Sequence, residues 1–439
     1  MHRSTAPSTV RAALVMAAGS CATLLACPPM TGGSEDPAWT RVSVSAAAVR
    51  GGEACRLAAE AQAAAEGAGR VDLAICLDTS GSMNGLIDSA RAKIWDIVSD
   101  LATAKPAPKL RVALLTYGND GLTQENGWTN VEADLTEDLD TVSQKLFALT
   151  TNGGTEYVGR VVDRATKALT WTPGEEALKI IVVAGNESAD QDQQVKYQEA
   201  SRRAIEKGIL VNSIYCGPIG DNLAPAWKEV SQLADGQFAA IDQDKGTVIV
   251  QTPFDDQLLS LNGALNATYV PYGDRGEWGA GNQVRQDANA VGVSSAVAAQ
   301  RCTAKGSSCY SNSQWDLVDA SAAADFKLES VEAKDLPEAM RSMSVDERRA
   351  YVESRRQERA RVQKEIQEVS AKRARFVAEE TARMGGDAGA FDRAFRTAVR
   401  AQAQARGFAF PVDAQPAPQP APAAPAAAGA VSGRSNGGC

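Results

Sequence analysis

Short apolar runs alternate with segments of helical spacing between residues 70 and 245. The apolar runs lie at 71–77, 111–117, 179–184, 209–215 and 237–241. Apolar residues recur at helical spacing over 85–102, 137–149, 156–169, 193–207 and 223–234. Residues 129–135 instead alternate apolar and polar positions, which is typical of an edge strand. Strands that are apolar on both faces and separated by helices predict an α/β fold with a doubly wound, mostly parallel sheet flanked by helices.

The pattern changes after residue 245. Residues 246–335 are rich in glycine, asparagine and aromatic residues, which predicts a loop-rich extension with a helix near 283–300. Residues 336–406 predict a C-terminal helical region, in which Ser344 and Glu347 form a capping box before a long charged helix. A second helix is expected near 388–405, with one apolar face formed by Phe391, Phe395, Ala398 and Val399.

The long charged helix has an interrupted apolar side. The residues on that side are Val352, Val362, Ile366, Val369 and Phe376, and the last four fit a heptad seam. Arg355, Arg359 and Arg373 interrupt this seam. A helical hairpin packed on itself or on the sheet domain, and a coiled coil with another chain, both remain open. The arginines favour the hairpin, because charged seam positions weaken a long two-stranded coil.

The first 26 residues have the features of an export signal. Arg3 and Arg11 precede an apolar stretch at 12–26. This stretch is too short to span a membrane, and Cys27 follows it directly. The ending L-L-A-C resembles the lipobox of bacterial lipoproteins. The resemblance implies a lipoprotein signal peptide, lipidation of Cys27, and a lipid-anchored protein of the bacterial cell envelope, at the periplasmic face or in the outer membrane. Lipidation at Cys21, or an ordinary cleaved signal peptide, is the alternative.

These observations divide the chain into six parts. They are a signal peptide (1–26), a flexible tether (27–69), the sheet domain (70–245), the loop-rich extension (246–335), the helical region (336–406) and a disordered Pro/Ala-rich tail (407–439). We therefore expect the protein to contact the membrane only through its lipid anchor.

Charge and histidine content exclude several function classes. The formal net charge is −9, which argues against a nucleic-acid partner. The only histidine is His2, which lies in the signal peptide. Its position excludes Ser-His-Asp and Cys-His catalysis and histidine-ligated metal sites in the rest of the chain. Any bound metal should therefore be a hard cation held by oxygen ligands.

The eight cysteines do not form a C-x-x-C motif. Cys76 and Cys216 lie in apolar runs and are expected to be buried thiols. Cys302 and Cys309 bracket a short loop and could form a disulfide in an oxidising compartment. The sequence assigns no partner to Cys55 or to Cys439.

A cluster of oxygen ligands follows the first apolar run. Asp78, Ser80 and Ser82 lie at i, i+2 and i+4 in D-T-S-G-S, where the carboxyl end of a buried strand is expected. One carboxylate and two hydroxyls form a hard half-shell that suits Mg²⁺ or Mn²⁺. The alternative is a turn whose serines cap the helix at 85–102.

The motif resembles the metal-ion-dependent adhesion site (MIDAS), D-x-S-x-S, of the von Willebrand factor type A (vWA) family. The resemblance covers residues 70–245 and implies that Thr155, in T-N-G-G-T-E, is a further metal ligand. The family usually has an aspartate in its third loop, and here Ala184 in V-V-A-G-N-E stands at that position. Asn186 and Glu187 are the nearest substitutes.

The resemblance implies a protein that binds a partner through the ion, with adhesion as the typical outcome. A carboxylate of the protein partner would complete the coordination of Mg²⁺ or Mn²⁺. A structural scaffold that acts through its C-terminal helices is the alternative. An enzyme is not expected: a single ion could activate water, but only Glu156 or Glu187 lies nearby as a base. A glutamate beside a metal-site threonine is expected to lie at the surface or behind the ligands.

Overall fold

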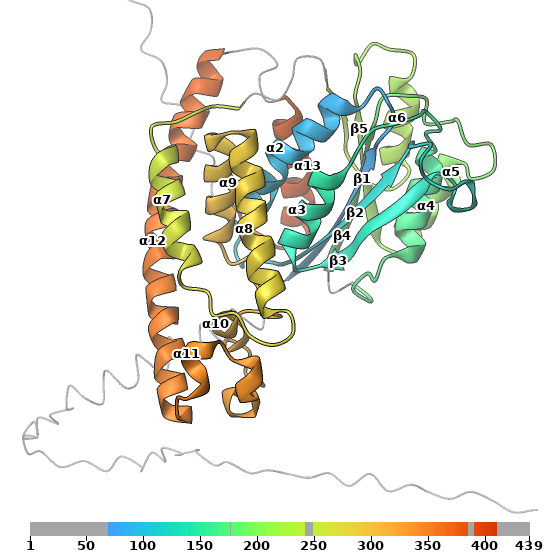
Figure 1. The fold of residues 1–439 in the computed structure, drawn as a ribbon. Coiled ribbons are helices and arrows are strands. Elements are labelled where there is room, and N and C mark those ends of the chain that lie inside the picture. Colours follow the sequence, from blue (N-terminus) through green and yellow to red (C-terminus); the bar gives the residue numbers. More distant parts are fainter. Residues whose placement is uncertain (1–68, 176, 242–248, 385–389, 411–439) are drawn as a thin grey trace, which may run out of the picture. The chain divides into compact units, whose positions relative to one another are not determined.

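The apolar runs form a six-stranded sheet in the computed structural model, which describes residues 69–175, 177–241, 249–384 and 390–410 (Figure 1). The strand order is β3-β2-β1-β4-β5-β6. The strands are β1 (Arg70–Asp78), β2 (Lys109–Tyr117), β3 (Thr129–Thr136), β4 (Ala177–Gly185), β5 (Ile209–Tyr215) and β6 (Phe238–Ala240). All neighbouring pairs are parallel except β2 with β3, which are antiparallel. The predicted fold class and the predicted edge strand are therefore confirmed.

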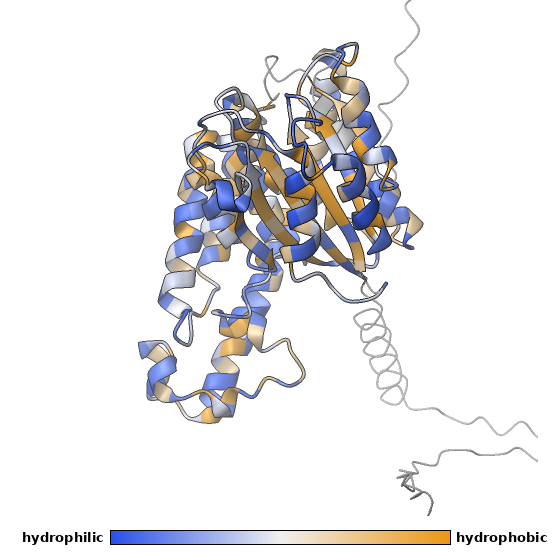
Figure 2. Ribbon diagram, turned by 90° about the vertical axis from the view of Figure 1, so that its right-hand side faces the viewer, coloured by the Kyte–Doolittle hydropathy of each residue, from blue (hydrophilic) through white to orange (hydrophobic). Residues whose placement is uncertain are grey.

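Helices cover both faces of this sheet. They are α2 (Asn84–Leu101), α3 (Leu139–Ala148), α4 (Val158–Ala168), α5 (Tyr197–Glu206) and α6 (Ala224–Gln232), and a short 3-10 turn lies at Gln124–Asn126. The alternation of side chains along β1 divides the core. Leu73 and Ile75 face the helices α2 and α3, whereas Ala74 and Cys76 face α4, α5 and α6. The strands are accordingly hydrophobic and the outer helix surfaces are polar (Figure 2). We refer to β1–β6 with α2–α6 as the sheet unit.

The segment after the sheet unit is mostly helical, which corrects the prediction of a loop-rich extension. It contains α7 (Asp255–Asn266), α8 (Gly276–Val293) and α9 (Ser295–Lys305). Shorter elements follow at α10 (Leu317–Ala320), Leu328–Ser330, Ala333–Asp335 and α11 (Glu338–Arg341). The helix expected near 283–300 overlaps the end of α8 and the start of α9, which are two separate helices. Hydrophobic periodicity missed the start of α8, because its buried positions there are Gly276, Gly279 and Asn282 rather than large apolar side chains.

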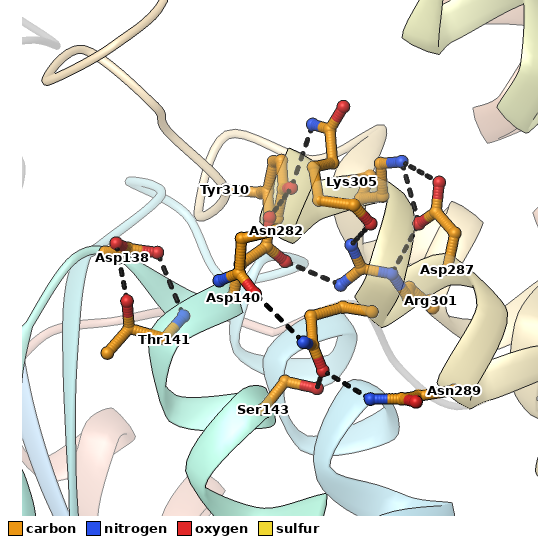
Figure 3. A network of polar contacts seen from close by, with 12 residues as sticks. Asp138, Asp140, Thr141, Ser143, Asn282, Asp287, Asn289, Arg301, Lys305 and Tyr310 are labelled. Carbon is orange, nitrogen blue, oxygen red and sulfur yellow. Dashed lines mark hydrogen bonds and ion pairs between the residues drawn. The ribbon is translucent and has the colours of Figure 1, made fainter. Parts of the chain in front are cut away.

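A buried polar network fastens α8 and α9 to the sheet unit (Figure 3). Arg301 on α9 donates to Asp140 on α3 at 2.8 Å and to Asp287 on α8 at 2.6 Å. Lys305 donates to Asp287 at 3.0 Å, and the Tyr310 hydroxyl donates to the second oxygen of Asp140 at 2.7 Å. Each buried charge in this network thus has an opposite charge beside it, as burial requires.

The apolar seam of the long helix α12 (Val345–Met384) packs against other helices of the same chain. Val362, Ile366 and Val369 pack in one apolar cluster with leucines of α7. Two of the three interrupting arginines are buried: Arg359 donates to Asp316 at 2.7 Å, and Arg373 donates to Asp255 at 2.8 Å. The third, Arg355, is half-buried over the Tyr351 ring. The two buried arginines therefore fix α12 to its own chain, and this seam offers no coiled-coil surface to another chain.

The last helix, α13 (Ala390–Ala405), packs on the sheet unit rather than on α12. Its Ala398 and Val399 are buried as expected. Gln402 donates to Asn212 of β5 at 2.7 Å, and Arg400 donates to Asp100 of α2. The predictions for the side chains of Phe391 and Phe395 lie outside the described residues.

The four cysteines of the described chain are free thiols. Cys76 and Cys216 are buried, as predicted. Cys302 and Cys309 are also free and buried, so the expected disulfide is absent. The reason is that Cys302 packs in the α7/α12 cluster, whereas Cys309 faces the core of the sheet unit, with its thiol 3.5 Å from the Pro108 carbonyl oxygen.

The predicted signal peptide, tether and tail, and the lipidation at Cys27, lie outside the described residues, as do Cys55 and Cys439. Among the helices that the structure does describe, none combines the length and the apolar character that a membrane crossing requires.

Candidate metal centre

The D-T-S-G-S loop leaves the carboxyl end of β1, between β2 and β4. Asp78 is fully buried, and its Oδ1 accepts a hydrogen bond of 2.8 Å from the Ser80 backbone N–H. The hydroxyls of Ser80 and Ser82 lie 3.2 Å apart. The structure therefore brings three of the four predicted ligands together, with the carboxylate innermost and Ser82 exposed at the rim.

The serines do not cap the following helix. The N-cap position of α2 is Met83, and its side chain makes no capping hydrogen bond. Because the capping alternative required a serine hydroxyl to accept a helix N–H, the structure leaves the hydroxyls of Ser80 and Ser82 turned toward each other and toward the loops around them.

A second loop, residues 150–156, lies against the first and carries Thr155. Backbone hydrogen bonds join the two loops, from Gly81 N–H to the Gly153 carbonyl at 2.9 Å and from Asn152 N–H to the Thr79 carbonyl at 3.0 Å. Thr155 forms an isolated β-bridge with Gly118, and its hydroxyl donates to Asp120 Oδ1 at 3.4 Å. Thr155 thus lies at the mouth of the site, bonded to the loop that follows β2.

Gly118 is the residue around which these side chains converge. Its φ is +80°, a backbone conformation that favours glycine. A Cβ placed there would lie 2.5 Å from Asp78 Oδ1 and 2.9 Å from Glu156 Cγ. Only glycine allows the two acidic side chains to approach this point.

The strand β4, which leads into the third loop, contributes Gly185, and not Ala184, beside Asp78. Ala184 is buried on the α2 face of the sheet, where its carbonyl accepts a hydrogen bond of 2.9 Å from the Tyr117 hydroxyl. A Cβ at Gly185 would lie 3.1 Å from Asp78 Oδ2. The position that faces the site is therefore Gly185, one residue later than the Ala184 that the resemblance to the vWA motif indicated, and it carries no side chain.

The two expected substitutes in the third loop differ. Asn186 Nδ2 donates to the Ser82 hydroxyl at 3.0 Å, so Asn186 reaches the rim of the site. The Glu187 side chain is exposed, and its backbone carbonyl accepts a 2.7 Å hydrogen bond from the Trp227 indole. The third loop thus offers one neutral amide to the site.

Glu156 is the site residue whose role the sequence interpretation missed. It was expected at the surface or behind the ligands, but it is 3% exposed and packs with Asp78 against Gly118. Burial raises the pKa of Asp78 to about 7, although hydrogen bonds from Ser80 oppose this shift. Burial and then the nearby charge of Asp78 raise the pKa of Glu156 to about 8. Two acids are therefore buried side by side.

The donor set fits a hard divalent cation. Asp78 Oδ2 and Glu156 Oε2 are buried and have no hydrogen-bond partner among the described residues. Among the described residues, no group of three or more His, Cys, Asp or Glu side chains is arranged to hold a metal ion, so this site has two acidic side chains and completes its donor set with hydroxyls. Two carboxylates with hydroxyls are the ligands that Mg²⁺ and Mn²⁺ prefer.

Residues 72–248 match the family model of the von Willebrand factor type A domain. The sheet unit is a vWA domain. Its six-stranded sheet and the loop cluster at the carboxyl ends of the strands are the parts that this match covers. A search of the curated proteins found no match for the chain.

Two solved structures illustrate how far the likeness to the vWA domain extends. The proximal thread matrix protein 1 of the mussel byssus, solved with a zinc-occupied MIDAS motif, is 17% identical, with 40% of this chain aligned to 43% of that chain at a TM-score of 0.33. The pilus adhesin SpaC of Lactobacillus rhamnosus GG is 13% identical, with 40% of this chain aligned to 28% of that chain at a TM-score of 0.31. The chain thus spans less than half the length of either protein.

Proposed function

We propose that this chain is a lipid-anchored protein of the bacterial cell envelope whose vWA domain binds a protein partner through a divalent cation, Mg²⁺ or Mn²⁺. One observation supports this proposal above the others. Two buried carboxylate oxygens without partners lie beside a pair of hydroxyls, in loops that open to the surface. Buried carboxylates need a compensating positive charge.

Each residue of the site has a distinct role in this proposal. Asp78 supplies the charge that retains the ion, while Ser80, Ser82 and Thr155 supply hydroxyl oxygens. A bound divalent ion would supply a positive charge at the surface, to which a carboxylate of the partner could bind. Asn186 holds Ser82 at the rim through its 3.0 Å hydrogen bond. We propose binding rather than catalysis, because no histidine is available as a base in the vWA domain.

The test uses the purified full chain with Mn²⁺ or with chelator. We expect Mn²⁺ to raise the melting temperature of the wild type and to leave Asp78→Asn unchanged. Asp88→Asn is the matched control, because Asp88 lies on the adjacent helix with a side chain that is 73% exposed. Capture of partners from native membranes should require Mn²⁺ or Mg²⁺. The metal-dependent proposal fails if chelation and Asp78→Asn leave both measurements unchanged.

The alternative is a scaffold that binds its partner through the C-terminal helices. The structure leaves less of the apolar surface of these helices free for a partner than the sequence suggested. The apolar side of α12 is covered by α7 of the same chain. Deleting 336–406 would leave Asp255 and Asp316 without their arginines, so the deletion would unfold the neighbouring helices. Charge reversal of the exposed Arg361, Glu368 and Lys372 is the sharper test. Loss of partner capture in that variant, but not in Asp78→Asn, would favour the scaffold.

The anchor can be tested separately from the metal site. We expect the wild type to sediment with membranes and to incorporate labelled palmitate, and we expect Cys27→Ala to lose the label. Cys21→Ala is the matched control, since it changes the other cysteine of the signal peptide. A label that depends on Cys21 instead would reassign the lipidation site.

A further inference from the structure

We infer that Glu156 replaces the missing acid of the third loop and is the second carboxylate ligand of the bound cation. This inference rests on the proposed metal site and assigns a ligand within it. The vWA domain of this chain would then take its two acidic ligands from β1 and from the second loop, and none from the third.

The placement of Glu156 supports this assignment. Glu156 directly follows Thr155 and precedes α4, so the loop that presents the threonine also presents the acid. Its Cγ and Asp78 Oδ1 both lie within 3 Å of a Cβ placed at Gly118, at 2.9 and 2.5 Å. The two acidic side chains, which come from two different loops, therefore lie beside each other at Gly118, where one ion could be shared by the two.

The third loop has no room for an acidic side chain at the position that faces the site. At Gly185 no side chain is present, and a Cβ there would meet Asp78 Oδ2 and the Trp227 ring, each at 3.1 Å. The Tyr117 hydroxyl closes the same space by donating to the Ala184 carbonyl. An acid at Gly185 would not fit without moving these neighbours, so the second acid has to come from another loop.

Charge balance gives the inference its chemical reason. Within the described residues, no ion pair joins Asp78 or Glu156 to a basic side chain. Arg160, on the helix that follows Glu156, is already bound to Asp192 through two hydrogen bonds of 2.7 and 3.0 Å. Two buried carboxylates without a basic partner are costly for the fold. A divalent cation neutralises both at once and satisfies Asp78 Oδ2 and Glu156 Oε2.

The assignment has a consequence for binding. Two internal carboxylates balance the charge of a divalent ion, so the chain should hold its ion tightly without a partner. A carboxylate of the partner would then fill an open coordination position of the ion, and would not be needed to balance its charge. A site with Asp78 alone would depend on the partner's carboxylate for its second negative charge. Metal affinity of the isolated protein therefore separates the two arrangements.

The experiment measures Mn²⁺ binding to the purified full chain by electron paramagnetic resonance of free Mn²⁺, with melting temperature as a second readout. We expect Glu156→Gln to weaken Mn²⁺ binding by at least ~10-fold. The matched control is Glu187→Gln, an exposed acid of the neighbouring loop, and it should stay within about twofold of the wild type. Without metal at pH 8, Glu156→Gln should melt at a higher temperature than the wild type, because one of two like charges is gone.

The outcomes are distinguishable. If Asp78→Asn abolishes Mn²⁺ binding while Glu156→Gln binds as tightly as Glu187→Gln, the inference is wrong and the proposed metal site stands. If the wild type does not bind Mn²⁺, both are wrong. If Glu156→Gln does not fold, Glu156→Asp decides: the shorter acid should fold and bind Mn²⁺ more weakly than the wild type, and unchanged affinity would overturn the assignment.

Discussion

Asp78 and Glu156 come from different loops, yet each buries one carboxylate oxygen without a hydrogen-bond partner in the described structure. Both side chains press against the same glycine, Gly118. Without a cation, the two carboxyl groups must either hold protons or repel each other. The stability of the protein should therefore depend on pH and on bound metal through this one site.

The first prediction is a pH dependence of the metal-free protein. The pKa values of Asp78 and Glu156 are raised in the folded state, to about 7 and about 8, from ordinary values of 3.8 and 4.5. The folded state therefore holds protons that the unfolded state releases, and the free energy of unfolding should fall as the pH rises from about 4 to about 8. The slope is at most about 1.4 kcal/mol per pH unit for each acid that is still protonated. Urea denaturation in chelator between pH 5 and 9 measures it.

The control for this pH dependence is the double variant Asp78→Asn with Glu156→Gln, which keeps the side-chain shapes and removes both titrations. Its stability should vary less over the same range, and saturating Mn²⁺ should also reduce the decline in the wild type. A double variant with the slope of the wild type would assign the pH dependence to other groups.

Gly118→Ala should damage both the fold and the metal site. Gly118 has a φ of +80°, and an added Cβ would meet Asp78 and Glu156. Gly174→Ala is the matched control, because Gly174 has a φ of +64° and no atom within 4 Å of its Cβ position. We expect about 1–2 kcal/mol of destabilisation at Gly174 from the backbone alone, and about 1–3 kcal/mol more at Gly118 from the clash. Only Gly118→Ala should lower the affinity for Mn²⁺; equal effects of both variants would contradict the crowding seen here.

Arg359→Met should destabilise the protein by about 3–5 kcal/mol, because it leaves the buried Asp316 and the partly buried Asp319 without their cation. The Arg359 guanidinium donates to Asp316 at 2.7 Å and to Asp319 at 2.6 Å. Arg361→Met, two positions along α12 at a side chain that is 61% exposed, should change stability by less than about 0.5 kcal/mol. Urea denaturation of both variants makes the comparison, and a small effect at Arg359 would mean that α12 is not fixed through this pair.

Cys302 and Cys309 should be recovered as free thiols. Alkylation of the oxidised, denatured protein without reductant, followed by peptide mass spectrometry, should label both residues. Native protein should resist the same reagent, because burial raises the pKa of each thiol to about 12. A peptide containing a Cys302–Cys309 bond would restore the disulfide that the sequence suggested.

The fold of the vWA domain could be predicted because its strands are apolar on both faces and its helices are amphipathic. The helix expected near 283–300 overlaps α8 and α9, but the start of α8 was missed, because a buried position there carries an amide, Asn282. Such positions are recognisable only when their partners are known, since a buried amide needs a hydrogen bond from elsewhere in the chain.

The arrangement of the candidate metal site was predicted in part, and single residues explain which parts were missed. Asp78, Ser80 and Ser82 lie in one short segment, so spacing alone brings them together. Neighbouring residues of a strand point to opposite faces of the sheet. An error of one position therefore selected Ala184, which faces the hydrophobic core, instead of Gly185, which faces the site. Glu156 gave no signal, because most glutamates are exposed and its burial depends on Gly118, 38 positions earlier in the chain.

The described chain begins and ends at the same pole of the sheet. Gly69 lies against the Phe408 ring, and Lys105 exchanges backbone hydrogen bonds of 2.8 and 2.9 Å with Ala409. From Gly69 the nine residues of β1 lead to Asp78, a path of roughly 30 Å at the rise of a parallel strand. The candidate metal loops therefore lie at the opposite end of the sheet from the point where the described chain begins and ends, so segments joined at Gly69 or Phe410 leave the domain away from these loops.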